Sequence, residues 1–182
     1  MEFRIKFRPF KLEDAIFINK LRQEEEMEQL IGGSKRPVSY ERDLKWVEQI
    51  ILGDSQTSIY FAITFMDSDE IIGYASITDI DFRNGSCFWS GIKIDKTKSG
   101  KGVGTEVALK ILKYAFEELR MERCTGECLE NHEAVLRMLL KVGFKKEGLM
   151  RNRLYKNGKY NSQWLLSVIR EEYFEIKQNY GL

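Results

Sequence analysis

The chain has 182 residues, of which 43% are hydrophobic and 31% are charged. This length is typical of one domain with a buried core, and 12% aromatic residues with only 2 prolines argue against a disordered chain. The 29 Lys and Arg residues nearly balance the 28 Asp and Glu residues, which gives a net charge of +1. This balance excludes bulk electrostatic attraction as a basis for binding nucleic acid or a membrane surface, so neither is expected as a partner.

The N-terminus and the cysteines indicate a compartment. The segment 1–9 alternates apolar and charged residues and has no apolar h-region, so no signal peptide is expected. No apolar run approaches the roughly 20 residues that a membrane helix needs. Cys87, Cys124 and Cys128 are few and odd in number, which favours free thiols in a reducing environment. The sequence therefore predicts a cytoplasmic chain that forms a single domain over 1–182.

The first half of the chain predicts helices and then antiparallel strands. Alternation over 3–8 indicates a strand that ends before Pro9, and Ser39 is a good N-cap. The turns expected at 67–69 and at Asn84-Gly85 separate runs rich in β-branched and aromatic residues. We expect, in order, a strand at 3–8, one helix over 13–30, a break at 32–34, a helix after Ser39, and strands at 59–65, 71–78 and 87–94.

The second half predicts two more helices and three more strands. The segment after Gly104 carries apolar residues at helical spacing as far as Leu119. A buried strand at 123–129, a helix at 133–142 and a hairpin of 148–155 with 160–169 follow. The whole order predicts an α/β (α+β) fold, with a mixed, mostly antiparallel sheet and helices on both faces.

A glycine cluster precedes the clearest helix. The cluster is Lys98-Ser99-Gly100-Lys101-Gly102-Val103-Gly104-Thr105. A helix start offers unpaired N–H groups and positive dipole charge, and glycines let an anion approach the backbone. The cluster therefore predicts a phosphate or pyrophosphate site, although it matches neither Gly-x-x-x-x-Gly-Lys-Ser/Thr nor Gly-x-Gly-x-x-Gly. A glycine-rich turn without a ligand is the alternative.

These residues resemble the GNAT N-acetyltransferases. Gly102-Val103-Gly104 looks like the pyrophosphate loop of that family, and the resemblance extends over nearly the whole chain. The subgroup that it resembles contains ribosomal-protein N-terminal, spermidine and nucleotide-amino-sugar acetyltransferases. The further segments that carry this resemblance are Phe7-Arg8-Pro9, Ile71-Ile72-Gly73, Lys141-Val142-Gly143-Phe144, Glu147-Gly148 and Asn157-Gly158-Lys159-Tyr160.

The resemblance implies acetyl-CoA as donor and an amine as acceptor. No metal is expected, because His132 is the only histidine and a histidine-rich zinc site is therefore excluded. It implies that the backbone of Ile92 and Ile94 pairs with the pantetheine arm, in a slot between two splayed strands. The position of the family's asparagine falls on Asn131 or His132, depending on where the count starts. The residues implied to bind the cofactor are Ile92, Ile94, Lys98, Ser99, Gly100, Lys101, Gly102, Val103, Gly104, Thr105, Asn131 and His132.

Several positions depart from the family pattern. Ser99 stands where Gln or Arg is usual, Met138 or Leu139 where a tyrosine acid is usual, and Trp89 where an acidic residue is usual. Because neither Met nor Leu can donate a proton, the general acid is unassigned. We select Glu127 and Asn131 as catalytic candidates. The alternative role of Glu127 is structural, as a strand-edge carboxylate paired with a lysine.

Other polar residues are weaker candidates. Asp79 and Asp81 could bind a cationic amine, and turn structure is their alternative role. Arg151 and Arg153 would suit a phosphate-bearing acceptor such as a nucleotide sugar, and solvated hairpin charges are the alternative. The cysteines with His132 could hold a metal only if brought together, so buried thiols are favoured.

The sequence thus predicts transfer of an acetyl group from acetyl-CoA to a small amine or amino sugar, rather than to a protein N-terminus, by direct attack. A polyamine would need an acidic cleft, which 24–26, Glu28 and Asp81 could form. A non-catalytic CoA-binding sensor or interaction module is the alternative, and a domain that binds another nucleotide is a third hypothesis. A homodimer is compatible with the aromatic and acidic C-terminal tail.

Overall fold

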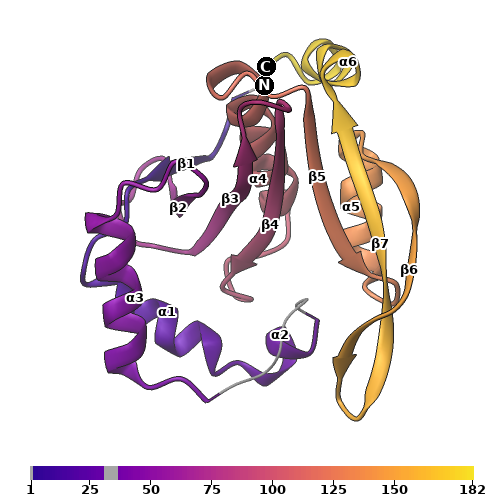
Figure 1. Cartoon of the computed structure of the whole chain (residues 1–182). Coiled ribbons are helices and arrows are strands. Elements are labelled where there is room, and N and C mark those ends of the chain that lie inside the picture. The colour runs from indigo at the N-terminus through magenta and orange to yellow at the C-terminus, as the bar shows by residue number, and fades with distance from the viewer. Residues whose placement is uncertain (1, 31–36) are drawn as a thin grey trace.

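The computed structural model of the chain describes residues 2–30 and 37–182 (Figure 1). The break expected at 32–34 lies outside the described residues. No helix in the described ranges is long and apolar enough to cross a membrane. The elements are β1 (Ile5–Arg8), α1 (Asp14–Arg22), α2 (Glu25–Leu30), α3 (Tyr40–Leu52), β2 (Ile59–Phe65), β3 (Gly73–Asp81), β4 (Ser86–Ile94), α4 (Val103–Lys113), a π-helical turn (Tyr114–Glu118), β5 (Arg123–Leu129), α5 (Glu133–Val142), β6 (Lys145–Lys156), β7 (Lys159–Ile169) and α6 (Arg170–Tyr180).

The strands form one seven-stranded sheet in the order β1-β2-β3-β4-β5-β7-β6. All neighbouring pairs are antiparallel except β4 and β5. The parallel pairing of β4 with β5 runs only from Ser86 opposite Arg123 to Trp89 opposite Gly126. Beyond that point the two strands diverge, so that the sheet opens like a V (Figure 1). The mixed, mostly antiparallel sheet and the splayed strands are as the sequence predicted.

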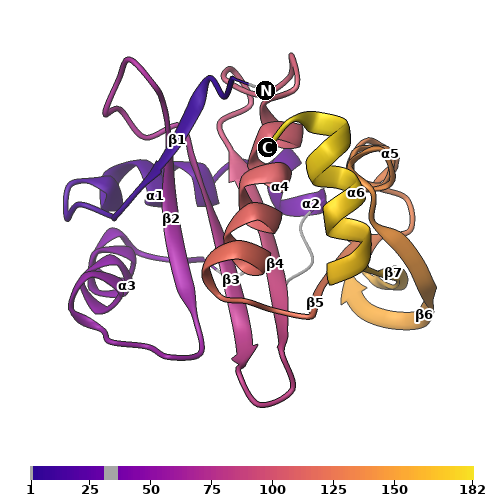
Figure 2. The ribbon, with the colours of Figure 1, turned by 90° about the horizontal axis from the view of Figure 1, so that it is seen from above.

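Helices cover both faces of the sheet. On one face, α4, α5 and α6 pack on the central and C-terminal strands, and Val107, Leu139 and Tyr173 belong to that core. On the other face, α1 and α3 bury Ile18 and Val47 in a smaller cluster. Figure 2 shows α4 crossing the middle of the sheet, at the boundary between its two halves.

The helix predicted over 13–30 is two helices, because α1 ends at Arg22 and α2 begins at Glu25. Glutamates oppose the dipole when they follow the C-terminal end of a helix, and they favour it in the first turn. The acidic run therefore starts a new helix, with Glu25, Glu26 and Glu28 in its first turn. This break turns α2 away from α1 and places it beneath β4 (Figure 1).

The strand boundaries differ from prediction in two places. The strand expected at 71–78 runs from Gly73 to Asp81, so Asp79 lies inside β3 with a φ of 49°. The last hairpin is longer than 148–155 and 160–169, because β6 starts at Lys145 and continues through two irregularities in its register with β7. Such irregularities bend a strand, and apolar periodicity in the sequence does not reveal them.

Candidate active site

A cleft of about 310 Å³ opens where β4 and β5 diverge, and α5 closes one side of it. Its walls come from segments far apart in the sequence. The lining residues are Tyr74, Ser76, Phe88, Trp89, Ser90, Gly91, Ile92, Lys93, Gly126, Glu127, Cys128, Leu129, His132, Val135, Met138, Leu139 and Gln163.

A bulge on β4 creates this opening. Ala75 of β3 lies opposite Ile92, and Ile77 lies opposite Trp89, so two residues of β4 oppose one of β3. Gly91 adopts a φ of 105°, which favours glycine, and the Trp89 indole Nε1 donates to the Gly91 carbonyl at 3.0 Å. Bulges bend a strand, and here the bend carries β4 away from β5. The β5-facing backbone beyond Trp89 is left without a strand partner.

The residues expected to pair with a pantetheine arm lie on this unpaired part of β4. Ile92 lines the cleft, and Ile94 ends the strand opposite Gly73 of β3. Both isoleucines also pack against the main core, so their side chains fix the strand while its other edge stays open. The open edge can therefore pair with one more extended chain, and the amide groups of a pantetheine arm could form such hydrogen bonds.

The glycine cluster forms a left-handed turn at the head of α4. Gly100, Lys101 and Gly102 have φ values of 85°, 47° and 90°. The first i to i−4 bond runs from Glu106 N to Gly102 O, so the amides of Gly104 and Thr105 precede the helical ladder. Cβ atoms added at Gly100 and Gly104 would meet no atom within 4 Å. The Cβ positions of Gly100 and Gly104 therefore face open space, beside two amides that precede the helical ladder.

The side chains around this turn are unequal. Lys98 and Lys101 are exposed and supply positive charge beside the helix start. The Ser99 hydroxyl instead donates to the Lys96 carbonyl at 2.8 Å, so it supports the turn. Val103 is buried in the core, where it anchors the first turn of α4.

Glu127 reaches the cleft from β5. Its side chain is 22% exposed, and Oε1 lies 3.9 Å from Nη2 of Arg153 on β6. The cationic partner is thus an arginine rather than the lysine of the structural alternative. A carboxylate at this place can accept a proton or hold a cation, and the long, partly exposed ion pair leaves one oxygen for either task.

The two candidates for the asparagine position are placed differently. Asn131 is exposed in the turn after β5 and is not among the residues that line the cleft. His132 lines the cleft at the head of α5, and burial lowers the pKa of its imidazole. Val135, Met138 and Leu139 continue the cleft side of that helix. No tyrosine stands on this face of α5.

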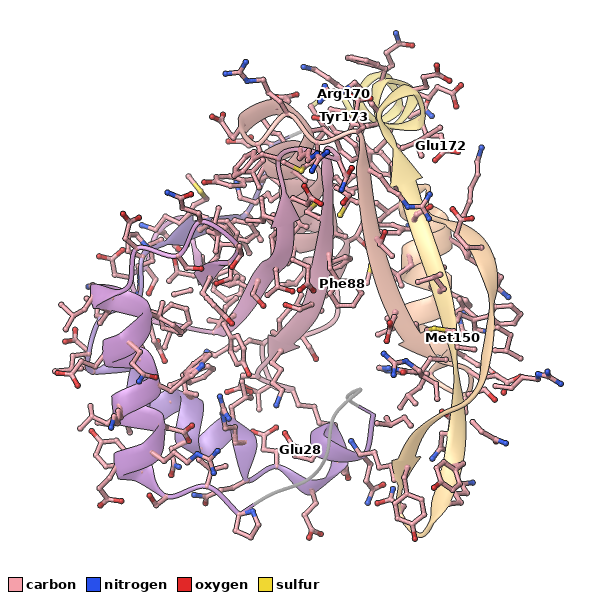
Figure 3. The ribbon with its side chains drawn as sticks, in the orientation of Figure 1. Glu28, Phe88, Met150, Arg170, Glu172 and Tyr173 are labelled. Carbon is pink, nitrogen blue, oxygen red and sulfur yellow. The ribbon has the colours of Figure 1, made fainter. Side chains whose placement is uncertain are left out.

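The sequence did not single out Lys93 or Tyr74. Lys93 of β4 forms an ion pair with Glu28 of α2 at 2.7 Å, and their side chains are only 15% and 14% exposed. Figure 3 places Glu28 beneath the end of β4 and Phe88 at the opening towards β5. Burial raises the pKa of Tyr74 to about 12, so its phenol stays protonated near neutral pH. Each residue lies in a strand of ordinary alternating pattern, so nothing in the neighbouring sequence indicates that it lines a cleft.

The weaker candidates lie elsewhere. Asp79 and Asp81 do not line the cleft, and the Asp81 carboxylate accepts bonds from the Arg83 and Asn84 amides of the following turn. Arg151 is exposed on β6 outside the cleft lining.

The cysteines are buried free thiols. Burial raises the pKa of Cys128 to about 11, so the one thiol that lines the cleft is protonated. Among the described residues, no group of three or more His, Cys, Asp or Glu side chains could hold a metal ion.

Comparisons with known proteins agree with this geometry. The model of the Acetyltransferase (GNAT) domain matches residues 4–145. The chain is 28% identical over 141 residues to the probable N-acetyltransferase YjcK of Bacillus subtilis, covering 78% of this chain and 73% of that protein. It is 25% identical over 171 residues to the uncharacterized N-acetyltransferase p20 of Bacillus licheniformis, covering 93% and 95%.

A solved structure has the same fold. It is a spermidine N-acetyltransferase of Vibrio cholerae in complex with CoA and spermine, with a TM-score of 0.84 and 17% sequence identity. The match covers 94% of this chain and 98% of that chain. With a family model that spans residues 4–145, a divergent β4–β5 pair and a glycine turn at the head of α4, the chain belongs to the GNAT acetyltransferase family.

Proposed function

We propose that the protein transfers an acetyl group from acetyl-CoA to the primary amine of a small molecule, by direct attack of the amine on the thioester. The observation that carries the proposal is that the unpaired edge of β4 and the glycine turn follow each other directly along the chain. The unpaired edge of β4 beyond Trp89 leads, within one short loop, to the exposed amides at the head of α4. An extended arm with a pyrophosphate at its end, as in acetyl-CoA, fits that sequence of partners.

The donor would be held mainly by backbone. The turn from Gly100 to Thr105 would bind the pyrophosphate, with charge from Lys98 and Lys101, while Ile92 and Ile94 offer backbone groups to the pantetheine amides. His132 would flank the arm from α5. An N–H group on the open edge of β4 would polarise the thioester carbonyl, which requires no particular side chain.

The chemistry requires a neutral amine next to that carbonyl. An alkylamine is mostly protonated near neutral pH, so a base must remove one proton before or during attack. We assign this role to Glu127, directly or through one water molecule. A C–N bond forms, the C–S bond breaks, and the thiolate of CoA leaves. No tyrosine stands on the α5 side of the cleft, so the thiolate takes its proton from solvent, to which the attacking nitrogen gives up its second proton as the amide forms.

The acceptor side of the cleft favours a small cationic molecule. Glu127 lines the cleft and has Arg153 as its basic partner, while Glu28 is paired with the lining residue Lys93. The structural neighbour from Vibrio cholerae was solved with spermine, a small polycationic amine, which supports an acceptor of this kind. An amino sugar is the other candidate acceptor, because Arg153, the partner of Glu127, would suit a phosphate on such a molecule.

Donor binding tests the proposal first, through a matched pair of variants at Gly104. An added Cβ there meets no atom within 4 Å, and Gly104 lies in the first turn of α4. Asp at this place suits the helix dipole but repels a pyrophosphate, whereas Ala changes only the volume. Acetyl-CoA at about 100 times its dissociation constant should stabilise the parent by about 2.7 kcal/mol.

We expect Gly104→Asp to fold at least as stably as the parent and to show no thermal shift with acetyl-CoA. Gly104→Ala should keep most of the shift. The absence of a shift in the folded parent would refute acetyl-CoA as donor. With the donor established, a panel of di- and polyamines, amino sugars and an N-terminal peptide would identify the acceptor by release of free CoA thiol. A donor shift with no turnover on any amine would favour the sensor hypothesis.

A further inference from the structure

Arg4 reaches the glycine turn from a distant part of the sequence. Its residue lies just before β1, and its guanidinium Nη2 donates to the Lys101 carbonyl at 2.7 Å. The two residues are separated by 97 positions. Lys101 is the non-glycine residue of the turn with a positive φ, 47°, which an L side chain disfavours. The arginine thus contacts the turn at its one non-glycine residue of positive φ.

The carboxylate of Glu106 holds the side chain of Arg4 in place. This carboxylate is almost fully buried on the first turns of α4, with a side-chain exposure of 4%. Oε2 accepts from the Arg4 backbone N–H at 2.8 Å, and Oε1 accepts from Arg4 Nε at 2.6 Å. The helix head, the start of β1 and the turn are therefore joined by three bonds through one arginine. Lysine lacks the planar fork that makes such an arrangement.

We propose that Arg4 is a positioning residue for the donor pyrophosphate. Arg4 holds the Lys101 carbonyl on the side of the turn that faces β1. This bond keeps Gly100, Lys101 and Gly102 at positive φ, the conformation in which the N–H groups of the turn can face a ligand. This inference rests on the proposed binding of acetyl-CoA and deepens it. Arg4 acts through the backbone of the turn, and the charge of its side chain is already engaged by Glu106.

A pair of ligands separates this role from general stability. Coenzyme A carries the pyrophosphate, and pantetheine carries the same arm without it. We would measure the dissociation constants of both by calorimetry and ligand-observed NMR for the parent, Arg4→Gln, Arg4→Lys and Glu106→Gln. Lys145→Gln, which breaks an ion pair with Glu172 far from the turn, is the control for losing an ion pair between two elements.

The expected result is specific to the nucleotide half of coenzyme A, which contains the pyrophosphate. Arg4→Gln and Glu106→Gln should weaken coenzyme A binding about tenfold and leave pantetheine binding unchanged. Arg4→Lys should show most of the same loss although the charge is kept. The loss should persist in about 0.5 M salt, where a simple charge effect is screened. Circular dichroism and melting temperature should report folded protein for every variant compared.

Other results overturn the inference in distinguishable ways. Parent-like binding by Arg4→Lys would mean that charge alone matters, and equal losses for both ligands would mean a general structural role. Parent-like coenzyme A binding by Glu106→Gln would place Arg4 in direct contact with the phosphate instead. If the folded parent itself fails to bind coenzyme A, the proposed function falls, and this inference falls with it.

Discussion

Glu127 and Arg153 meet across the cleft rim although β7 separates their strands in the sheet. An exposed ion pair of this length contributes little to the free energy of unfolding. The place of Glu127 in the cleft therefore says more about its role than its pairing with Arg153 does. In a cleft where Cys128 is protonated, Glu127 is the carboxylate among the described lining residues that can accept a proton from an entering amine.

Removing this carboxylate gives a residue-scale prediction. Glu127→Gln should lower kcat by about 10²–10⁴-fold, the range typical of a lost general base, with little change in the KM for acetyl-CoA. Steady-state kinetics at saturating donor would measure it. Glu133→Gln, which also removes one member of an exposed pair with Arg137, serves as control and should retain parent activity. Retained activity in Glu127→Gln would instead assign the residue to the structural pair with Arg153.

Side chains that act through partners distant in the sequence could not be predicted from the sequence. The glycine turn was predicted as an anion site because its signal is local: glycines, lysines and a helix start lie together. Arg4 and Glu106 are 102 positions apart, and nothing near either one reveals the other. Glu28 and Lys93 are likewise joined only by the fold. Side chains that act through long-range pairs become visible only when the elements are in place.

At the scale of elements, the Glu117 carboxylate joins the π-helical turn after α4 to α6, beside the stacked rings of Phe116 and Tyr173. Glu117 accepts bonds from the Tyr173 hydroxyl at 2.6 Å and the Lys177 ammonium at 2.7 Å, and Lys113 lies 3.0 Å away. Burial acts to raise the pKa of Glu117, but the bonds from Lys177, Tyr173 and Lys113 outweigh it and bring the pKa to about 2. Figure 3 shows Tyr173 at the base of α6, facing the body of the protein.

This carboxylate makes stability depend on pH. Because its pKa is lower in the folded chain than its ordinary 4.5, its contribution is present above pH 4.5 and is lost as the pH falls from 4.5 towards 2. Glu117→Gln should lower the free energy of unfolding by about 1–2 kcal/mol at pH 7, less than the full shift implies, since the side chain is a quarter exposed.

Urea unfolding at pH 7 and at pH 4 to 3 would measure this effect. The difference between parent and Glu117→Gln should shrink on acidification. The neighbouring Glu118 is exposed, so Glu118→Gln should change stability by less than about 0.5 kcal/mol at either pH. A difference that stays constant with pH would show that the carboxylate charge does not fasten α6.

Elements themselves were predicted well where one face is apolar and poorly where charge decides. The order of strands and helices follows from periodicity, and α5 and β5 lie where it placed them. The helix expected as far as Leu119 ends as α4 at Lys113 and continues as a π-helical turn from Tyr114 to Glu118. The division of 13–30 into α1 and α2 depends on where acidic residues stand relative to a helix end. The bulge at Ser90 and Gly91 depends on pairing with β3, which no local pattern on β4 expresses.

At the scale of the whole molecule, the sheet consists of two halves that share a short seam. The β1–β4 half and the β5–β7 half are hydrogen-bonded only between Ser86–Trp89 and Arg123–Gly126 in the described strands, and α4 packs over the boundary (Figure 2). A donor that lies along β4 and ends at the head of α4 would add contacts on both sides of the opening. Its binding should therefore strengthen the seam where the protein alone leaves it open.

Hydrogen exchange would follow this closure along the chain. Acetyl-CoA should slow exchange in segments 90–94 and 100–105, because β4 has no partner on its β5 side in 90–94 and the amides of Gly104 and Thr105 precede the helical ladder of α4. Segment 86–89 is already paired on both sides and should change little, and the tip of the last hairpin at 155–160 should not change. Protection confined to another groove, lined by Trp46, Ile50 and Tyr60, would place the ligand there and contradict the proposed donor site. Protection at both 90–94 and 100–105 in the parent, with only 90–94 retained in Arg4→Gln, would separate the arm-binding strand from the pyrophosphate turn within one molecule.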